Sequence, residues 1–245
     1  MRNLTLMVIL AALAVIPAIG DYIELNDGGS YIVNDNRYED DHVWLDYGDD
    51  YINTGTTFEL NSNGIVGGDI VAFNISEVDI SGGVVGEDVW GYGDSLVNIS
   101  NGIVNEDIWG WDDSDIQISG GTIGRDIHAR ENSGITISGG SIDGMLESMH
   151  SGIIYLDGSG FSIGGVGLSN GDSLRDFGTL ELLGFGDPFY TGIITGNLSD
   201  GSTLNNYFQI LESTNADIII VPEPATLSFL ITGLAAMVTR KRRHN

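Results

Sequence analysis

The middle of the chain repeats itself every 19 residues. From Ser62 to Leu156 it divides without a gap into five units: SNGIVGGDIVAFNISEVDI, SGGVVGEDVWGYGDSLVNI, SNGIVNEDIWGWDDSDIQI, SGGTIGRDIHARENSGITI and SGGSIDGMLESMHSGIIYL. Each unit opens on Ser-Gly-Gly or Ser-Asn-Gly, carries an aliphatic residue at its ninth place, and closes on two aliphatic residues separated by one other residue. A fixed period of this length indicates a solenoid, in which each unit packs only on its neighbours.

The ends of the units, such as 116–118 and 135–137, alternate aliphatic and other side chains, which is the period of a β-strand with one buried face. The same alternation around the ninth place puts Val89 and Gly91 inward. We therefore expect two or three short strands per unit, separated by glycine turns, and an all-β, single-stranded parallel β-helix. We favour a right-handed helix because parallel crossovers are almost always right-handed. The pattern resembles the β-helical repeats of bacterial adhesins and autotransporter passengers.

Less regular segments flank the five units, which cover residues 62–156. Residues 21–61 contain degenerate copies of the strand and its glycine turn, and we expect them to form an N-terminal cap. Residues 157–221 keep strand-like pairs such as Leu180 and Leu182 without the period. We expect this second flank to form a C-terminal β module that closes the solenoid.

Residues 1–20 have the features of a signal peptide. Arg2 supplies a positive start, an apolar stretch runs from Leu4 to Ile16, and Ala18 and Gly20 are the small residues of a cleavage site before Asp21. We expect a signal helix that signal peptidase removes on export. The chain contains no cysteine, so disulfides do not contribute to its stability.

The C-terminal segment, residues 222–245, combines three elements in a fixed order. They are a Pro-Glu-Pro turn, the uncharged stretch 225–239, and a basic cluster, with the residues Pro222, Glu223, Pro224, Arg240, Lys241, Arg242 and Arg243. Proline suits the first turn of a helix, so a transmembrane helix is expected over 225–239. It would span about 22 Å, short of the roughly 30 Å hydrocarbon core, so the bilayer thins or the basic side chains snorkel. Terminal cations stay cytoplasmic, which places residues 21–221 on the far side of the membrane.

This tail resembles the PEP-CTERM sorting signal of exported bacterial proteins. The resemblance covers residues 222–245 alone, and it implies recognition by an exosortase in the inner membrane of a Gram-negative-type bacterium. Cleavage near Pro-Glu-Pro would then leave a cell-surface or extracellular protein, and the family implies an association with exopolysaccharide or biofilm. An ordinary single-span anchor is the alternative interpretation of the same residues.

The exported part is strongly acidic. Between Asp21 and Val221 lie 34 acidic side chains and four arginines, a net charge of −30. Such a charge repels nucleic acid and anionic lipid head groups, so we exclude nucleic acid as a partner. It favours neutral or basic partners and divalent cations instead.

Outward positions of successive units carry one row of aspartates and two rows of mostly aromatic side chains. Aromatic faces suit the apolar face of a sugar ring, and carboxylates accept hydrogen bonds from its hydroxyls, so this surface is a candidate polysaccharide site. The candidates are Asp88, Trp90, Tyr92, Asp107, Trp109 and Trp111. The alternative is a structural ladder, worth roughly 0.2 to 1 kcal/mol per neighbouring pair without any ligand.

The aspartate row also predicts a calcium site. Its members occupy the same place in four successive units: Asp69, Asp88, Asp107 and Asp126. Like charges about 4.8 Å apart repel each other, and a hard cation bound through carboxylate oxygens would remove that cost. Solvated carboxylates or turn caps are the alternative interpretation.

Catalysis has little support in the sequence, although parallel β-helices also house polysaccharide lyases and hydrolases. Adjacent acids such as Asp112 and Asp113 are candidates for general acid–base chemistry, but residues 21–221 contain no lysine to abstract a proton beside a uronate. The histidines at 42, 128 and 150 show no metal-ligand or triad spacing. We therefore predict a non-enzymatic structural and binding protein of the cell surface or matrix, with a β-helical lyase or hydrolase as the alternative.

Overall fold

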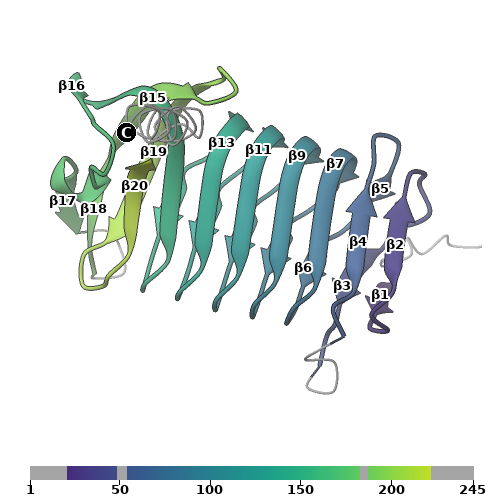
Figure 1. Cartoon of the computed structure of the whole chain (residues 1–245). Helices are drawn as coiled ribbons and strands as arrows, with labels where there is room; N and C mark the ends of the chain where they lie inside the picture. The colour runs from purple at the N-terminus through teal and green to yellow at the C-terminus, as the bar shows by residue number, and fades with distance from the viewer. Residues whose placement is uncertain (1–20, 49–53, 183–186, 222–245) are drawn as a thin grey trace, which may run out of the picture.

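The computed structural model describes residues 21–48, 54–182 and 187–221 (Figure 1). Asp21 is the first described residue. Ala18, Gly20 and the rest of the predicted signal helix lie outside the described residues, as do Pro222, Glu223, Pro224 and the whole sorting tail. Within the described ranges, no helix is both long enough and apolar enough to cross a membrane.

Two strands recur in each 19-residue unit. The long ones are β7 (Glu77–Val85), β9 (Leu96–Val104), β11 (Asp115–Ile123) and β13 (Gly134–Ile142). The short ones are β8 (Val89–Gly91), β10 (Ile108–Gly110), β12 (Ile127–Ala129) and β14 (Leu146–Ser148). Each pairs in parallel with its equivalent one coil away, at a spacing of 19 residues. The chain is therefore an all-β parallel solenoid of about seven turns, as the repeat predicts (Figure 1).

In the later units the opening Ser-Gly-Gly or Ser-Asn-Gly does not separate short strands, which differs from the expectation. In the first unit a turn at 61–64 does separate two short strands, 57–60 and 65–66. The end of one unit and the start of the next form one continuous nine-residue strand that runs through Ser-Gly-Gly. The second glycine bends this strand: Gly121 has φ +85°, and a Cβ there would lie 2.9 Å from the carbonyl oxygen of Gly102. Glycine can adopt this backbone conformation without steric cost, so parallel pairing continues on both sides of the bend.

The N-terminal flank continues the same two sheets. β1 (Tyr22–Leu25) pairs in parallel with β3 (His42–Leu45), and β2 (Ser30–Val33) pairs with β4 (Thr57–Leu60). β3 then pairs with β6 (Ile70–Ala72), while β4 and β5 (Ile65–Val66) pair with β7. The coils thus begin before the regular repeat does.

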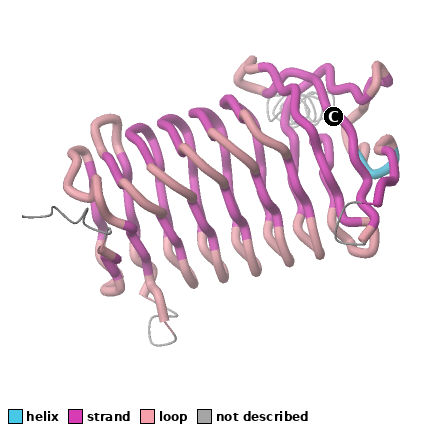
Figure 2. Tube along the Cα trace, turned by 180° about the vertical axis from the view of Figure 1, so that it is seen from behind, coloured by secondary structure: helices cyan, strands magenta, loops and turns pink. Residues whose placement is uncertain are grey.

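The C-terminal flank leaves the solenoid and returns to it. Its elements are β15 (Ile153–Ile163), β16 (Val166–Gly167), a short 3-10 helix (Leu174–Asp176), β17 (Thr179–Leu182), β18 (Pro188–Leu198), β19 (Thr203–Leu211) and β20 (Asp217–Val221). β17, β18 and β19 form an antiparallel sheet at one end of the rod (Figure 2). β19 also pairs in parallel with β14, and β20 pairs with β15, so these two strands close a last coil.

Rows of aliphatic side chains fill the interior. Val89, Ile108 and Ile127 stack on one another at successive coils and have no exposed surface. On the facing sheet, Val97 and Ile116 make an equivalent row. Burying each such side chain stabilises the fold by roughly 1.5 to 3 kcal/mol, so packing and coil-to-coil hydrogen bonds hold together a chain that has no disulfide.

Gly121→Ala tests the bend in the long strand. A Cβ at this positive φ is strained and crowds the preceding coil, so we expect the free energy of unfolding in urea to fall by roughly 1 to 2 kcal/mol or more. Gly134→Ala is the matched control, because a Cβ there meets nothing within 4 Å. The control should be neutral or stabilise by up to about 1 kcal/mol. Equal losses in both variants would contradict this account of the bend.

Candidate functional site

The outer side of the short strands gathers all six residues proposed for polysaccharide binding. Because Val89 and Gly91 face the core, Trp90 and its equivalents face outward along the rod. We call Val71, Trp90, Trp109, His128 and Glu147 the first row, since each pairs with the next in register. The second row, two residues further along each coil, consists of Phe73, Tyr92, Trp111, Arg130 and Met149. The aspartate row, Asp69, Asp88, Asp107 and Asp126, precedes the short strands.

The rings of the first row stack face to face along the rod. The Trp90 and Trp109 centroids are 4.9 Å apart with an angle of 6° between the ring planes. On its other side, Trp109 meets the His128 ring at 3.7 Å and 14°. Both faces of Trp109 are therefore covered by neighbouring rings, and only its edge can meet a ligand.

The second row stacks in the same way and joins the first. Phe73 and Tyr92 lie 5.1 Å apart at 11°, and Tyr92 and Trp111 lie 6.2 Å apart at 15°. The Arg130 guanidinium lies 5.4 Å from the Trp109 ring and so ends the aromatic part of the surface with a cation–π contact. This arrangement is a structural ladder over most of its length, whatever else it binds.

Each carboxylate of the aspartate row is tied to the next coil. The Oδ1 atom of Asp69 accepts a hydrogen bond from the backbone N–H of Asp88 at 3.0 Å, and Oδ1 of Asp88 accepts from Asp107 at 2.8 Å. Oδ1 atoms of the following two aspartates make the same contact, with Asp126 and Met145. The row thus caps the turn before each short strand, and it leaves the second carboxylate oxygen of each residue for other partners.

The pKa of Asp88 reflects both its burial and the carboxylates around it. Burial raises this pKa above its ordinary value of 3.8, and the negative charges of Asp107, Asp69 and Glu106 raise it further. The hydrogen bond from the N–H of Asp107 acts in the opposite direction, since it favours the ionised form. The ladder therefore carries an electrostatic cost that a proton or a cation would reduce.

A buried polar cluster continues the first row beyond the aromatic rings. His128 and Glu147 are both 5 % exposed, and His128 Nδ1 lies 2.7 Å from the Glu147 carboxylate. The same carboxylate pairs with Arg130 and accepts a hydrogen bond from Gln209 of β19. Burial by itself would raise the pKa of Glu147, but the contacts with His128, Arg130 and Gln209 together hold it below its usual value. Glu147 thus links the regular coils to the last one.

The sequence shows no metal-ligand spacing around the histidines, yet the structure places two of them beside carboxylates. His42, Asp69 and Glu87 bring one ligand atom each within 4.8 Å of one another, as do Asp107, Asp126 and His128. His128 and Glu147 are separated by 19 residues, so the repeat period itself could have revealed their contact. His42 lies 27 residues before Asp69, in the irregular flank, where no period relates the two.

The same geometry shows which residues could hold a metal. The second carboxylate oxygens of the aspartate row suit calcium, although Oδ2 of Asp69 already lies 3.2 Å from His42 Nδ1. The two groups that include a histidine suit a transition metal such as zinc. In both groups some atoms already serve the fold: His42 Nδ1 accepts the N–H of Asp69 at 2.9 Å. Calcium at Asp69, Asp88, Asp107 and Asp126 remains a prediction.

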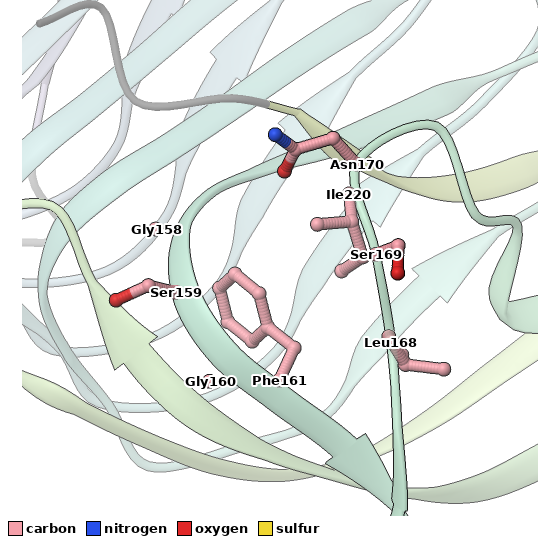
Figure 3. A pocket seen from close by; sticks show the side chains of 8 residues that line it. All are labelled: Gly158, Ser159, Gly160, Phe161, Leu168, Ser169, Asn170 and Ile220. Atoms are coloured by element: carbon pink, nitrogen blue, oxygen red, sulfur yellow. The ribbon is translucent and has the colours of Figure 1, made fainter. Parts of the chain in front are cut away.

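The acid pair Asp112 and Asp113 lies in a turn of the same coil as Trp111. Asp112 accepts a hydrogen bond from the N–H of Gly93 in the preceding coil, and Asp113 accepts one from Asn132 in the following coil. The two carboxylates thus contact opposite neighbours. A separate hollow of 430 Å³ lies near the C-terminal sheet, lined by residues that include Phe161 and Asn170, and it has no ionisable side chain in its lining (Figure 3).

Comparisons with protein-family models, with curated proteins and with solved structures found no match to this chain.

Asp88→Asn tests whether the ionised carboxylates of the aspartate row destabilise the fold. Asparagine keeps the Oδ1 acceptor for the N–H of Asp107 but removes one charge. Because the carboxyl holds its proton to a higher pH in the folded state, its ionisation opposes folding above that pH. We expect Tm at pH 7 to rise by about 1 to 3 °C, and the gain to vanish below pH 3.8, where the carboxyl is protonated in both states. Asp113→Asn, at an exposed position, is the control, and a Tm loss in Asp88→Asn at neutral pH would refute the argument.

Calcium should relieve the same repulsion. If the row binds calcium, Tm in millimolar calcium will exceed Tm in chelator, because a ligand that binds only the folded state stabilises it. Magnesium at equal ionic strength controls for screening of the exposed charges. An identical Tm in calcium, magnesium and chelator would remove the calcium prediction and leave the aspartates as turn caps.

Proposed function

We propose that this protein is an exported structural and binding protein of the cell surface or extracellular matrix, associated with exopolysaccharide. The observation that carries the proposal is the outer face of the short strands, where two rows rich in aromatic rings run beside a row of carboxylates. Carbohydrate ligands combine apolar ring faces with hydroxyl groups, and this surface offers a partner for each.

The shape of the molecule suits a matrix role. A solenoid spaces equivalent groups evenly along a rod, so it can meet a polymer whose own groups repeat. The charge of −30 on residues 21–221 keeps such a rod soluble and disfavours acidic polymers. The right-handed winding belongs to the same proposal and stays a prediction.

Export and sorting rest on the two ends of the sequence. We propose that signal peptidase cuts before Asp21 and that an exosortase-type enzyme recognises the tail from Pro222 to Asn245. In the structure, β20 completes the last coil at Val221, immediately before this tail. Removal of the tail would therefore leave every described strand in the mature protein.

Mass spectrometry of the protein from its native host tests this proposal. The culture is separated into membrane, medium and extracellular polysaccharide, and each fraction is searched for terminal peptides. We expect a mature chain that starts at Asp21, ends near Val221 to Pro224, and is enriched in the polysaccharide fraction. A chain that keeps residues 225–245 and stays in the membrane fraction would contradict both the sorting and the matrix role.

A further inference from the structure

The stacked rings of the first row stop at Val71, and another tryptophan lies one coil beyond it. Val71 lies in register between Trp44 of β3 and Trp90 of β8. The Trp109 ring stacks on one face of Trp90, whereas the coil on the other side offers Val71, a smaller side chain that is 6 % exposed. Among the described residues, Trp44 and Trp90 share no ring contact. Trp90 therefore differs from Trp109, which is covered on both sides.

A groove of about 260 Å³ lies at this interruption. Its lining consists of Trp44, Asp69, Val71, Phe73, Trp90 and Tyr92. The Trp44 ring is inclined at 63° to Phe73, with which it makes an edge contact at 6.1 Å. The indole N–H of Trp44 is buried and has no hydrogen-bond partner within the described part of the chain. We call this site the Val71 groove.

The charges beside the Val71 groove are mostly negative. Asp69 lies in the lining and Glu87 lies near it, with His42 Nδ1 at 3.2 Å from the Asp69 carboxylate and 4.0 Å from that of Glu87. The Glu87 side chain is 51 % exposed, and Oδ1 of Asp69 is occupied by the N–H of Asp88. In a domain of charge −30, this setting attracts a cation and repels a uronate.

We propose that the Val71 groove binds a sugar unit that carries a free amine, within a polysaccharide of glucosamine type. The apolar face of the sugar ring packs on the open face of Trp90, and its ammonium group lies against the carboxylates of Asp69 and Glu87. This inference rests on the proposed association with polysaccharide, and it names both the subsite and the chemistry of the sugar. The rest of the ladder serves as the rigid support of Trp90.

The variant Val71→Trp distinguishes binding in the Val71 groove from binding along the whole aromatic ladder. The new ring fills the groove and joins Trp44 to Trp90, so the surface gains an aromatic side chain while the open face is lost. Ile193→Trp is the matched control, because Ile193 is exposed on β18 and does not line the Val71 groove. Tm of both variants is measured first, and we expect it to stay the same or rise for Val71→Trp.

Binding is measured by calorimetry on the full-length protein in mild detergent, with glucosamine hexamer and with its fully N-acetylated counterpart as probes. We expect the glucosamine hexamer to bind the unmodified protein and Ile193→Trp equally, at least tenfold more tightly than the acetylated hexamer, and more weakly as salt rises. Val71→Trp should lose at least tenfold in affinity. Equal or tighter binding by Val71→Trp would overturn the groove, and equal binding of the two hexamers would overturn the role of the amine.

A failure of this inference is distinguishable from a failure of the proposed function. If Val71→Trp still enriches in the polysaccharide fraction of the host while neither hexamer binds, the matrix association stands and the Val71 groove is refuted. If the protein is absent from that fraction but the glucosamine hexamer binds and Val71→Trp abolishes binding, the groove stands without the matrix role.

Discussion

Parallel hydrogen bonding between coils, in a 19-residue register through the regular units, is the constraint on which the rest of this structure depends. Once one coil pairs with the next, every side chain lies about 4.8 Å from its equivalent above and below. Aliphatic residues then form continuous buried rows, as Val89, Ile108 and Ile127 do. The same rule applies outside, where rings meet rings and carboxylates meet carboxylates.

The register stabilises the rows of stacked rings and destabilises the row of stacked carboxylates. Stacked rings such as Trp90 and Trp109 gain contact without a ligand, because their faces meet at each step. Stacked carboxylates repel, and the pKa of Asp88 is raised first by its burial and then by the neighbouring negative charges. Hydrogen bonds offset this repulsion, because each carboxylate accepts one from a backbone N–H of the next coil.

The outer face of the short strands is less closely packed at one end of the rod than at the other. It passes from the open groove at Val71 through covered tryptophans to the buried contacts of His128, Arg130 and Glu147. Gln209 adds a strand from the far end of the sequence to this cluster. One end of the row thus presents a surface on which a ligand could rest, while the other is closed by the packing of the C-terminal module.

The period by itself determined the solenoid, the parallel pairing and which residues face outward, because a 19-residue repeat with alternating aliphatic residues can bury its apolar face only by stacking. The period also predicted that Asp88, Trp90, Tyr92 and their equivalents share one outer face. The sequence could not show that Ser-Gly-Gly bends a strand rather than ending it, that β19 and β20 close a last coil, or that His42 meets Asp69. It also could not show that Trp109 is covered on both faces while Trp90 borders a groove. These features arise from contacts outside the repeat or from the orientation of rings, and only packing in three dimensions decides them.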